Sequence, residues 1–67
     1  MKRTYIVPRM MCANCQKKVE KRLNRVRNIS YTIDLANKSV IVYFNGEVDD
    51  SRVINAIMRA GYEAHRL

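Results

Sequence analysis

The sequence has no tryptophan, one proline and two glycines, and it lacks any long apolar run. A helix that spans a bilayer needs about 20 mostly apolar residues, and a secretory signal needs about 7 to 15 in its hydrophobic part. The short apolar run Tyr5–Val7 is stopped at once by Pro8. We therefore expect no membrane insertion and a cytoplasmic protein, in which thiols stay reduced.

Acidic residues are also scarce, with 6 Asp and Glu against 13 Lys and Arg, which gives a net charge of +7. This imbalance favours an acidic partner, whether a protein, a nucleic acid or a membrane surface. The chain has only 67 residues, enough for one modest hydrophobic core. We therefore assign residues 1–67 to a single domain and expect no separate catalytic domain.

The first half of the chain predicts a strand, a loop and a helix. Residues 4–7 are mostly β-branched and aromatic, which is typical of a short strand. From Cys15 onward the apolar residues repeat at the spacing of one helical face, at Val19, Leu23 and Val26. The helix should end near Asn28, because asparagine tolerates the left-handed backbone conformation that closes helices.

The second half predicts a hairpin, a second helix and a last strand. In residues 29–35 apolar side chains alternate with polar ones, and in residues 40–44 one set of alternate side chains is expected to face inward and the other outward. Both patterns indicate half-buried strands. Residues 49–60 have an acidic start and an apolar helical face, Gly61 follows as the cap, and residues 62–66 are long enough for a strand. The order β-α-β-β-α-β predicts an α+β, ferredoxin-like sandwich, with a four-stranded antiparallel sheet and both helices on one face.

Both cysteines lie in the stretch MMCANC, residues 10–15, just after the first predicted strand. Cys15 opens the predicted helix, where the positive end of the helix dipole favours a thiolate. Ionised thiols suit metal binding and redox exchange alike, so this position leaves both functions open. A structural disulfide is disfavoured, because the pair would close a very small loop and a cytoplasmic compartment keeps thiols reduced.

Two of the remaining alternatives lack the residues that they need. A thioredoxin-like redox protein uses a larger scaffold and usually has Trp and Pro beside its cysteine pair, and both are missing here. A closed zinc site needs four ligands, but the chain offers only His65 besides the two thiols, and we expect it about 10 Å along a terminal strand. Two soft thiolates suit Cu(I), and Ag(I) or Hg(II) for the same reason, better than Zn(II).

Positive side chains form a stripe on the first predicted helix. They fall within an arc of about 100° and begin one turn from the cysteine loop, at Lys18, Lys21, Arg22 and Arg25. Such a stripe is most often a solvated helix face. Because of its position, we expect it to dock an acidic metal acceptor and to steer the encounter.

An RNA-binding domain of the same topology is a further alternative, because such domains stack bases on aromatic residues of the open sheet face. Here that face should carry Ile6, Ile41 and Tyr43. The glycine-aromatic signature of the third strand is absent from residues 39–44, and RNA binding leaves the cysteine pair unexplained. We therefore expect no nucleic-acid partner.

Taken together, these residues resemble the heavy-metal-associated domain family, which covers small copper chaperones and the N-terminal metal-binding domains of copper-transporting P-type ATPases. The resemblance spans nearly the whole chain. It rests on the Met-x-Cys-x-x-Cys loop at residues 10–15, the first helix at 19–23, strand segments at 33–35 and 40–44, and Ala-Gly-Tyr-x-Ala at 60–64.

The resemblance implies a non-enzymatic carrier of soft metal, most simply a Cu(I) metallochaperone-like protein. Such a protein passes its ion by thiolate exchange to a metal-transporting P-type ATPase or another acceptor. By position, the resemblance assigns Cys12 and Cys15 as metal ligands, Met10 as a residue packed under the loop, and Tyr62 as a residue close to the site. It also admits an isolated domain of a metal ATPase, or a protein that binds mercury or another heavy metal. We expect a monomer without metal, and the open coordination leaves room for a metal-bridged dimer.

The loop departs from the family pattern before the first cysteine. Arg9 stands where the family usually has Gly, and Met11 where it usually has Thr. The Met11 thioether is either a weak auxiliary ligand for Cu(I) or a solvent-facing loop side chain.

Overall fold

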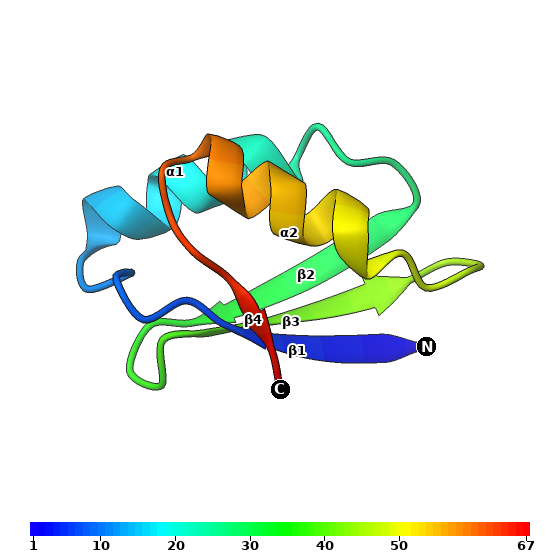
Figure 1. Cartoon of the computed structure of the whole chain (residues 1–67), viewed down its shortest axis with the longest axis horizontal. Coiled ribbons are helices and arrows are strands. Elements are labelled where there is room, and N and C mark those ends of the chain that lie inside the picture. Colours follow the sequence, from blue (N-terminus) through cyan, green and yellow to red (C-terminus); the bar gives the residue numbers. More distant parts are fainter.

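Residues 1–67 are all described by the computed structural model, in which two helices lie on one face of a single sheet (Figure 1). The elements are β1 (Lys2–Ile6), α1 (Ala13–Leu23), β2 (Ile29–Asp34), β3 (Ser39–Phe44), α2 (Asp50–Arg59) and β4 (His65–Arg66). The strand order is β2-β3-β1-β4, and every neighbouring pair is antiparallel. The predicted ferredoxin-like sandwich is confirmed. Neither helix combines the length and the apolar character that a membrane span requires.

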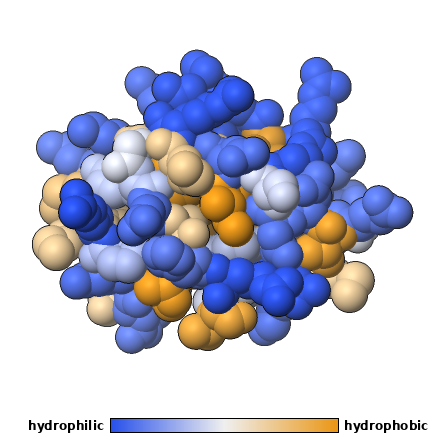
Figure 2. Space-filling model, in the orientation of Figure 1, coloured by the Kyte–Doolittle hydropathy of each residue, from blue (hydrophilic) through white to orange (hydrophobic).

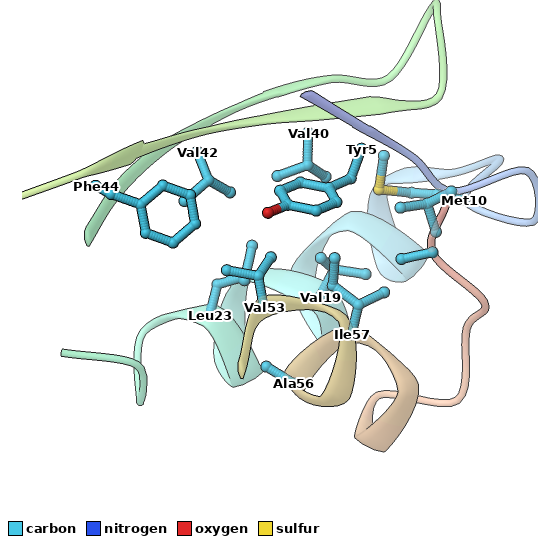
Figure 3. Close-up of a cluster of buried hydrophobic side chains, with 12 residues drawn as sticks. Tyr5, Met10, Val19, Leu23, Val40, Val42, Phe44, Val53, Ala56 and Ile57 are labelled. Carbon is cyan, nitrogen blue, oxygen red and sulfur yellow. The ribbon is translucent and has the colours of Figure 1, made fainter. Parts of the chain in front are cut away.

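The core lies between the helices and the sheet, and the periodicity of the sequence explains its membership. Alternate residues of β3 point inward, and residues of each helix at helical spacing point toward them (Figure 3). Ile41 is half-buried and Tyr43 is 43% exposed on the opposite, open face. The central buried side chains are Tyr5, Val40, Val42 and Phe44 from the sheet and Val19, Leu23, Val53, Ala56 and Ile57 from the helices.

The first helix begins and ends earlier than the sequence pattern predicts. It starts at Ala13 and stops at Leu23, because the backbone then tightens into turns with hydrogen bonds from Arg25 N to Arg22 O and from Val26 N to Leu23 O. Asn28 does adopt a left-handed conformation, with φ of 63°, but it leads into β2 and does not cap the helix. The predicted end of this helix was therefore wrong by about one turn.

The C-terminal end of α2 is closed by a Schellman arrangement. Gly61 has φ of 97°, its N–H donates to Met58 O at 2.9 Å, and the Tyr62 N–H donates to Ile57 O at 3.3 Å. The left-handed conformation explains the glycine and confirms its predicted capping role. The final strand is shorter than predicted, because only His65 and Arg66 pair with β1.

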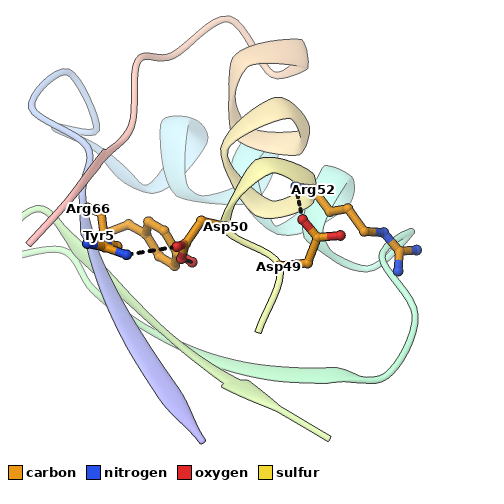
Figure 4. Close-up of polar contacts among 5 residues, drawn as sticks. All are labelled: Tyr5, Asp49, Asp50, Arg52 and Arg66. Carbon is orange, nitrogen blue, oxygen red and sulfur yellow. Dashed lines mark hydrogen bonds and ion pairs between the residues drawn. The ribbon is translucent and has the colours of Figure 1, made fainter. Parts of the chain in front are cut away.

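A polar network connects the start of α2 to the two strands beneath it (Figure 4). The hydroxyl of Tyr5, which is fully buried, donates to the Asp50 carboxylate, and Arg66 Nη1 donates to the other Asp50 oxygen at 3.0 Å. Burial, followed by the contact with Asp50, raises the pKa of Tyr5. The hydrogen bond from Tyr5 holds the pKa of Asp50 below its usual range. One carboxylate therefore links β1, α2 and β4.

Replacing Tyr5 by Phe should lower the free energy of unfolding by about 1 to 2 kcal/mol, because the buried hydroxyl donates to a charged acceptor. Urea unfolding monitored by circular dichroism measures the change. Tyr43→Phe is the matched control, since Tyr43 is exposed, and it should leave stability nearly unchanged. Equal effects of the two substitutions would contradict the role assigned to the network.

Candidate metal centre

The loop between β1 and α1 is held against the core by one methionine and two backbone contacts. Met10 is fully buried at the loop end of the core cluster (Figure 3). Its N–H donates to Val7 O at 3.0 Å, and the Val7 N–H donates to Lys38 O at 2.7 Å. The packing position that the family resemblance implies for Met10 is therefore confirmed, and its sulfur points away from solvent.

Both cysteines lie at the N-terminal end of α1. Cys12 is the residue immediately before the helix, with an extended backbone (φ −145°, ψ 169°), and Cys15 is the third helical residue. The prediction that Cys15 opens the helix was wrong, because the helix starts at Ala13. The earlier start brings both thiols close to the free backbone N–H groups and the positive end of the helix dipole.

The two thiols face each other and are reduced. Their Sγ atoms are 3.2 Å apart, within hydrogen-bonding range, and both cysteines are free. Cys12 is exposed and Cys15 is half-buried. Metal–sulfur distances are about 2.3 Å in zinc sites. For an ion to lie at a similar distance between both sulfurs, the two Sγ atoms need to move only modestly apart. Rotation of the exposed Cys12 side chain can supply that separation.

The surroundings of Cys15 favour its ionised form. The Tyr62 side chain is the main cause, and the Cys12 thiol and the backbone of Met11 add to it, so that the pKa of Cys15 falls from 9.0 to about 7. Burial acts in the opposite direction and raises the pKa. The same contact raises the pKa of Tyr62, because the phenol is a donor to the thiolate and must keep its proton. The thiolate of Cys15 is thus more accessible near neutral pH than that of an ordinary cysteine.

Tyr62 reaches the cysteines because the Schellman turn at Gly61 ends α2 close to the start of α1. Tyr62 is half-buried and packs against the core cluster as well as contacting Cys15. Its predicted proximity to the site is therefore confirmed. Tyr62 thus fills the edge of the core and lies beside the thiols at the same time.

Two other candidate ligands are not brought into a shared site. His65 is exposed, lies opposite Ile6 in the sheet, and has Nε2 at 3.7 Å from Glu63 Oε2. Met11 is 68% exposed, in agreement with a solvent-facing loop side chain. No group of three or more His, Cys, Asp or Glu side chains is arranged to hold a metal ion. The only paired soft donors are the two thiols.

The positive stripe continues from α1 into the turn that follows it. Lys18, Lys21 and Arg22 lie on the helix, whereas Arg25 lies beyond its end. The ion pairs of the structure are His65–Glu63 and Arg66–Asp50, so none of the four stripe residues is paired with an acid. Near the cysteine end, the stripe meets Arg59 of α2, a neighbour that the sequence pattern did not reveal.

The chain is similar to copper-related proteins of two lengths. It is 42% identical over 55 residues to the copper-transporting ATPase 1 of Rhizobium meliloti, an alignment that covers 81% of this chain and 7% of the ATPase. It is 31% identical over 64 residues to the COP-associated protein of Helicobacter pylori, covering 94% of this chain and 97% of that protein. The chain thus spans a small part of the ATPase and nearly all of the Helicobacter protein.

Solved structures agree in fold. Apo-CopP from Helicobacter pylori superposes with a TM-score of 0.83 at 31% identity, covering 96% of this chain and 98% of CopP. A His61Tyr mutant of the copper chaperone Atx1 from Synechocystis PCC6803 superposes with a TM-score of 0.78 at 27% identity, covering 92% of this chain and 97% of Atx1. The model of the heavy-metal-associated domain matches residues 4–63. With this match, the shared fold and the paired thiols at the start of α1, the chain belongs to the heavy-metal-associated domain family.

Proposed function

We propose that this protein carries one Cu(I) ion on Cys12 and Cys15 and passes it to an acceptor by thiolate exchange. The observation that carries the proposal is the pair of Sγ atoms 3.2 Å apart, one of which has a pKa of about 7. Soft thiolates select Cu(I) over harder ions, and a thiol with a lowered pKa loses less of its affinity to competition with protons. Ag(I) and Hg(II) are alternative ions at the same two sulfurs.

The exposure of the pair suits transfer better than storage. Cys12 is exposed, so a thiolate of the acceptor can approach the ion from the solvent side. One new sulfur–copper bond then forms while one bond to Cys12 or Cys15 breaks, and the copper remains Cu(I) throughout. No bond of another substrate is made or broken, in keeping with a non-enzymatic role.

The similar proteins support two settings for this exchange. One is a small carrier, as suggested by the COP-associated protein, and the other is a metal-binding domain of a copper ATPase, of which the chain matches 6 to 7%. In both settings residues 1–67 act as one domain at the cytoplasmic side, and the acceptor or donor is a metal-transporting ATPase. We propose the carrier setting, with the ATPase domain as the alternative in which the same two thiols would act.

The acceptor is expected to dock on the positive stripe beside the cysteine loop. Lys18 and Lys21 are exposed and free of ion pairs, and they lie one to two turns from Cys15. An acidic patch on the acceptor would be attracted to them and would be oriented with its own thiols near Cys12. Such complementarity mainly raises the rate of association and fixes the orientation of the complex.

Replacing both cysteines by serine should weaken Cu(I) binding by more than about 100-fold. Loss of a residue that only hydrogen-bonds a metal ligand already lowers metal affinity by up to about 100-fold, and here the ligands themselves are removed. Competitive titration against a chromophoric Cu(I) chelator measures the affinity and the stoichiometry, which should be one ion per chain. His65→Ala is the control and should bind as the wild type does. Cu(I) affinity that is indifferent to the serine substitutions, or weaker than Zn(II) affinity, would overturn the proposal.

Removing the Tyr62 hydroxyl should raise the pKa of Cys15 from about 7 toward its ordinary value of 9.0. Iodoacetamide alkylates the thiolate, so the rate of Cys15 alkylation rises with pH and its midpoint follows the pKa. This midpoint should therefore move to higher pH in Tyr62→Phe, as followed by mass spectrometry of the metal-free protein. Tyr43→Phe removes a remote, exposed phenol and should leave the profile unchanged. An unshifted profile in Tyr62→Phe would show that this phenol does not favour the thiolate.

Reversing charge at the stripe should slow copper transfer. We expect Lys18→Glu/Lys21→Glu to lower the transfer rate to the metal-binding domain of a copper ATPase by about tenfold at low salt, with a weaker dependence on ionic strength. Lys2→Glu/Arg27→Glu changes the net charge equally at exposed positions outside the four stripe residues, in β1 and just before β2, and serves as the control. Stopped-flow kinetics over a range of salt concentrations distinguishes the two. Equal slowing would mean that total charge, and not the stripe, governs the encounter.

A further inference from the structure

A groove between α1 and α2 gathers four arginines. It is an open hollow of about 290 Å³, lined by Arg22 and Arg25 on one side, Arg52 and Arg59 on the other, together with Val26, Asn55 and Ala56. The groove is separate from the cysteine loop, which contributes none of its lining residues. Hydrophilic side chains cover this helical layer along the upper edge of the molecule (Figure 2).

The arginines form two rows, with Arg22 at the end of α1 and Arg25 in the turn that follows on one side, and two arginines of α2 on the other. Arg52 and Arg59 are seven residues apart on α2, so they lie on the same face, separated by about 10 Å along the axis. Between them Asn55 and Ala56 present short side chains that leave the groove open. Arg22, at the end of α1, also lines the adjoining hollow toward the cysteine end, together with Lys18 and Lys21.

The positive charge of the groove is not neutralised within the protein. No acidic residue lines it, and neither ion pair of the structure includes one of its arginines. Arg52 also lines a neighbouring hollow with Glu47 and Asp49, but it forms an ion pair with neither. Asp49 accepts from the Arg52 backbone N–H at 3.3 Å, and the Arg52 side chain extends away from it (Figure 4). Four like charges around one groove repel each other, so a bound anion would stabilise this arrangement.

The chemistry of the lining favours phosphate groups. A guanidinium group presents parallel N–H donors that match two phosphate oxygens, which an ammonium group does not. No aromatic side chain lines the groove, so it offers no surface on which a nucleobase could stack. Its volume is that of a small-molecule site of roughly 300 Å³, and it is concave, unlike the broad surface of about 800 Å² that each partner buries in a protein complex.

We propose that this groove binds a linear oligophosphate, a chain of three or more phosphates such as inorganic polyphosphate or the triphosphate of a nucleotide. Successive phosphates lie between the two arginine rows and contact guanidinium groups from both helices. The binding does not need the thiols or a metal ion, and the proposal does not rest on copper transfer.

Isothermal titration of the reduced, metal-free protein with sodium tripolyphosphate tests the proposal. Binding at one site is expected, and Arg22→Gln/Arg52→Gln should weaken it by about tenfold or more, because it removes one guanidinium from each row. Lys2→Gln/Lys38→Gln removes the same charge from β1 and from the turn between β2 and β3, which do not line the groove, and should change the affinity by less than about twofold. Arg22→Lys/Arg52→Lys keeps the charge but loses the paired donors, and should fall between these two.

Two further titrations identify the source of the phosphates and test whether the groove acts independently of the thiols. Tighter binding of ATP than of tripolyphosphate would assign the site to a nucleotide, and equal or weaker binding of ATP would assign it to the phosphate chain itself. Cys12→Ser/Cys15→Ser should bind tripolyphosphate as the wild type does, whatever its Cu(I) affinity. Thermal unfolding confirms that each variant is folded.

Three results would overturn the proposal. The first is no measurable binding of tripolyphosphate or ATP at low salt. The second is equal weakening by the groove and control double variants, which would indicate attraction to the net charge alone. The third is tight binding of single-stranded RNA that tripolyphosphate does not displace, which would assign the positive surface to nucleic acid.

Discussion

Both helices pack their apolar faces on the same side of one sheet, and the positions of the thiols, of Tyr62 and of the arginines all follow from this packing. Val19 and Leu23 of α1 meet Val53 and Ile57 of α2 above the inward side chains of β3. Burial of this kind contributes roughly 25 cal/mol per Å² of apolar surface and is the main favourable term in a domain of this size. The helices run in opposite directions, so the start of α1 lies close to the end of α2 (Figure 1).

This antiparallel arrangement gives the two ends of the helix pair different chemistry. At one end, the start of α1 supplies thiols and free backbone N–H groups, and the end of α2 supplies a phenol that favours the Cys15 thiolate. Along the seam, the same helices and the turn that follows α1 bring four guanidinium groups together. Both features are distant in sequence but close in space, because the core fixes the relative position of the helices.

The sequence predicts the layers well because the patterns that encode them are local. Alternation in residues 40–44 gives the buried face of β3, and the spacing of Val19 and Leu23 gives that of α1. The start of α1 was misplaced because Cys12 occupies the capping position without a side-chain hydrogen bond, so no capping signal marks it. Its end was misplaced because the left-handed Asn28 closes a turn that follows the helix.

Only part of the candidate site could be predicted from the sequence. Spacing paired Cys12 with Cys15, and the family resemblance placed Tyr62 near them, as the fold confirms. Their role as metal ligands stays a prediction, since it depends on an ion. The contribution of Arg52 and Arg59 could not be predicted, because they join Arg22 only when the two helices pack.

The Schellman turn at Gly61 also separates the candidate site from the weakest part of the sheet. The last strand pairs with β1 at only two positions and lies at an edge, so it is expected to open locally more often than the rest of the fold. Tyr62 is fixed before that strand begins, by its own N–H bond to Ile57 of α2. Fraying of the C-terminus can therefore release Arg66 from Asp50 while the phenol stays beside Cys15. The position of Tyr62 beside the thiols is thus set by α2 and not by the terminal strand.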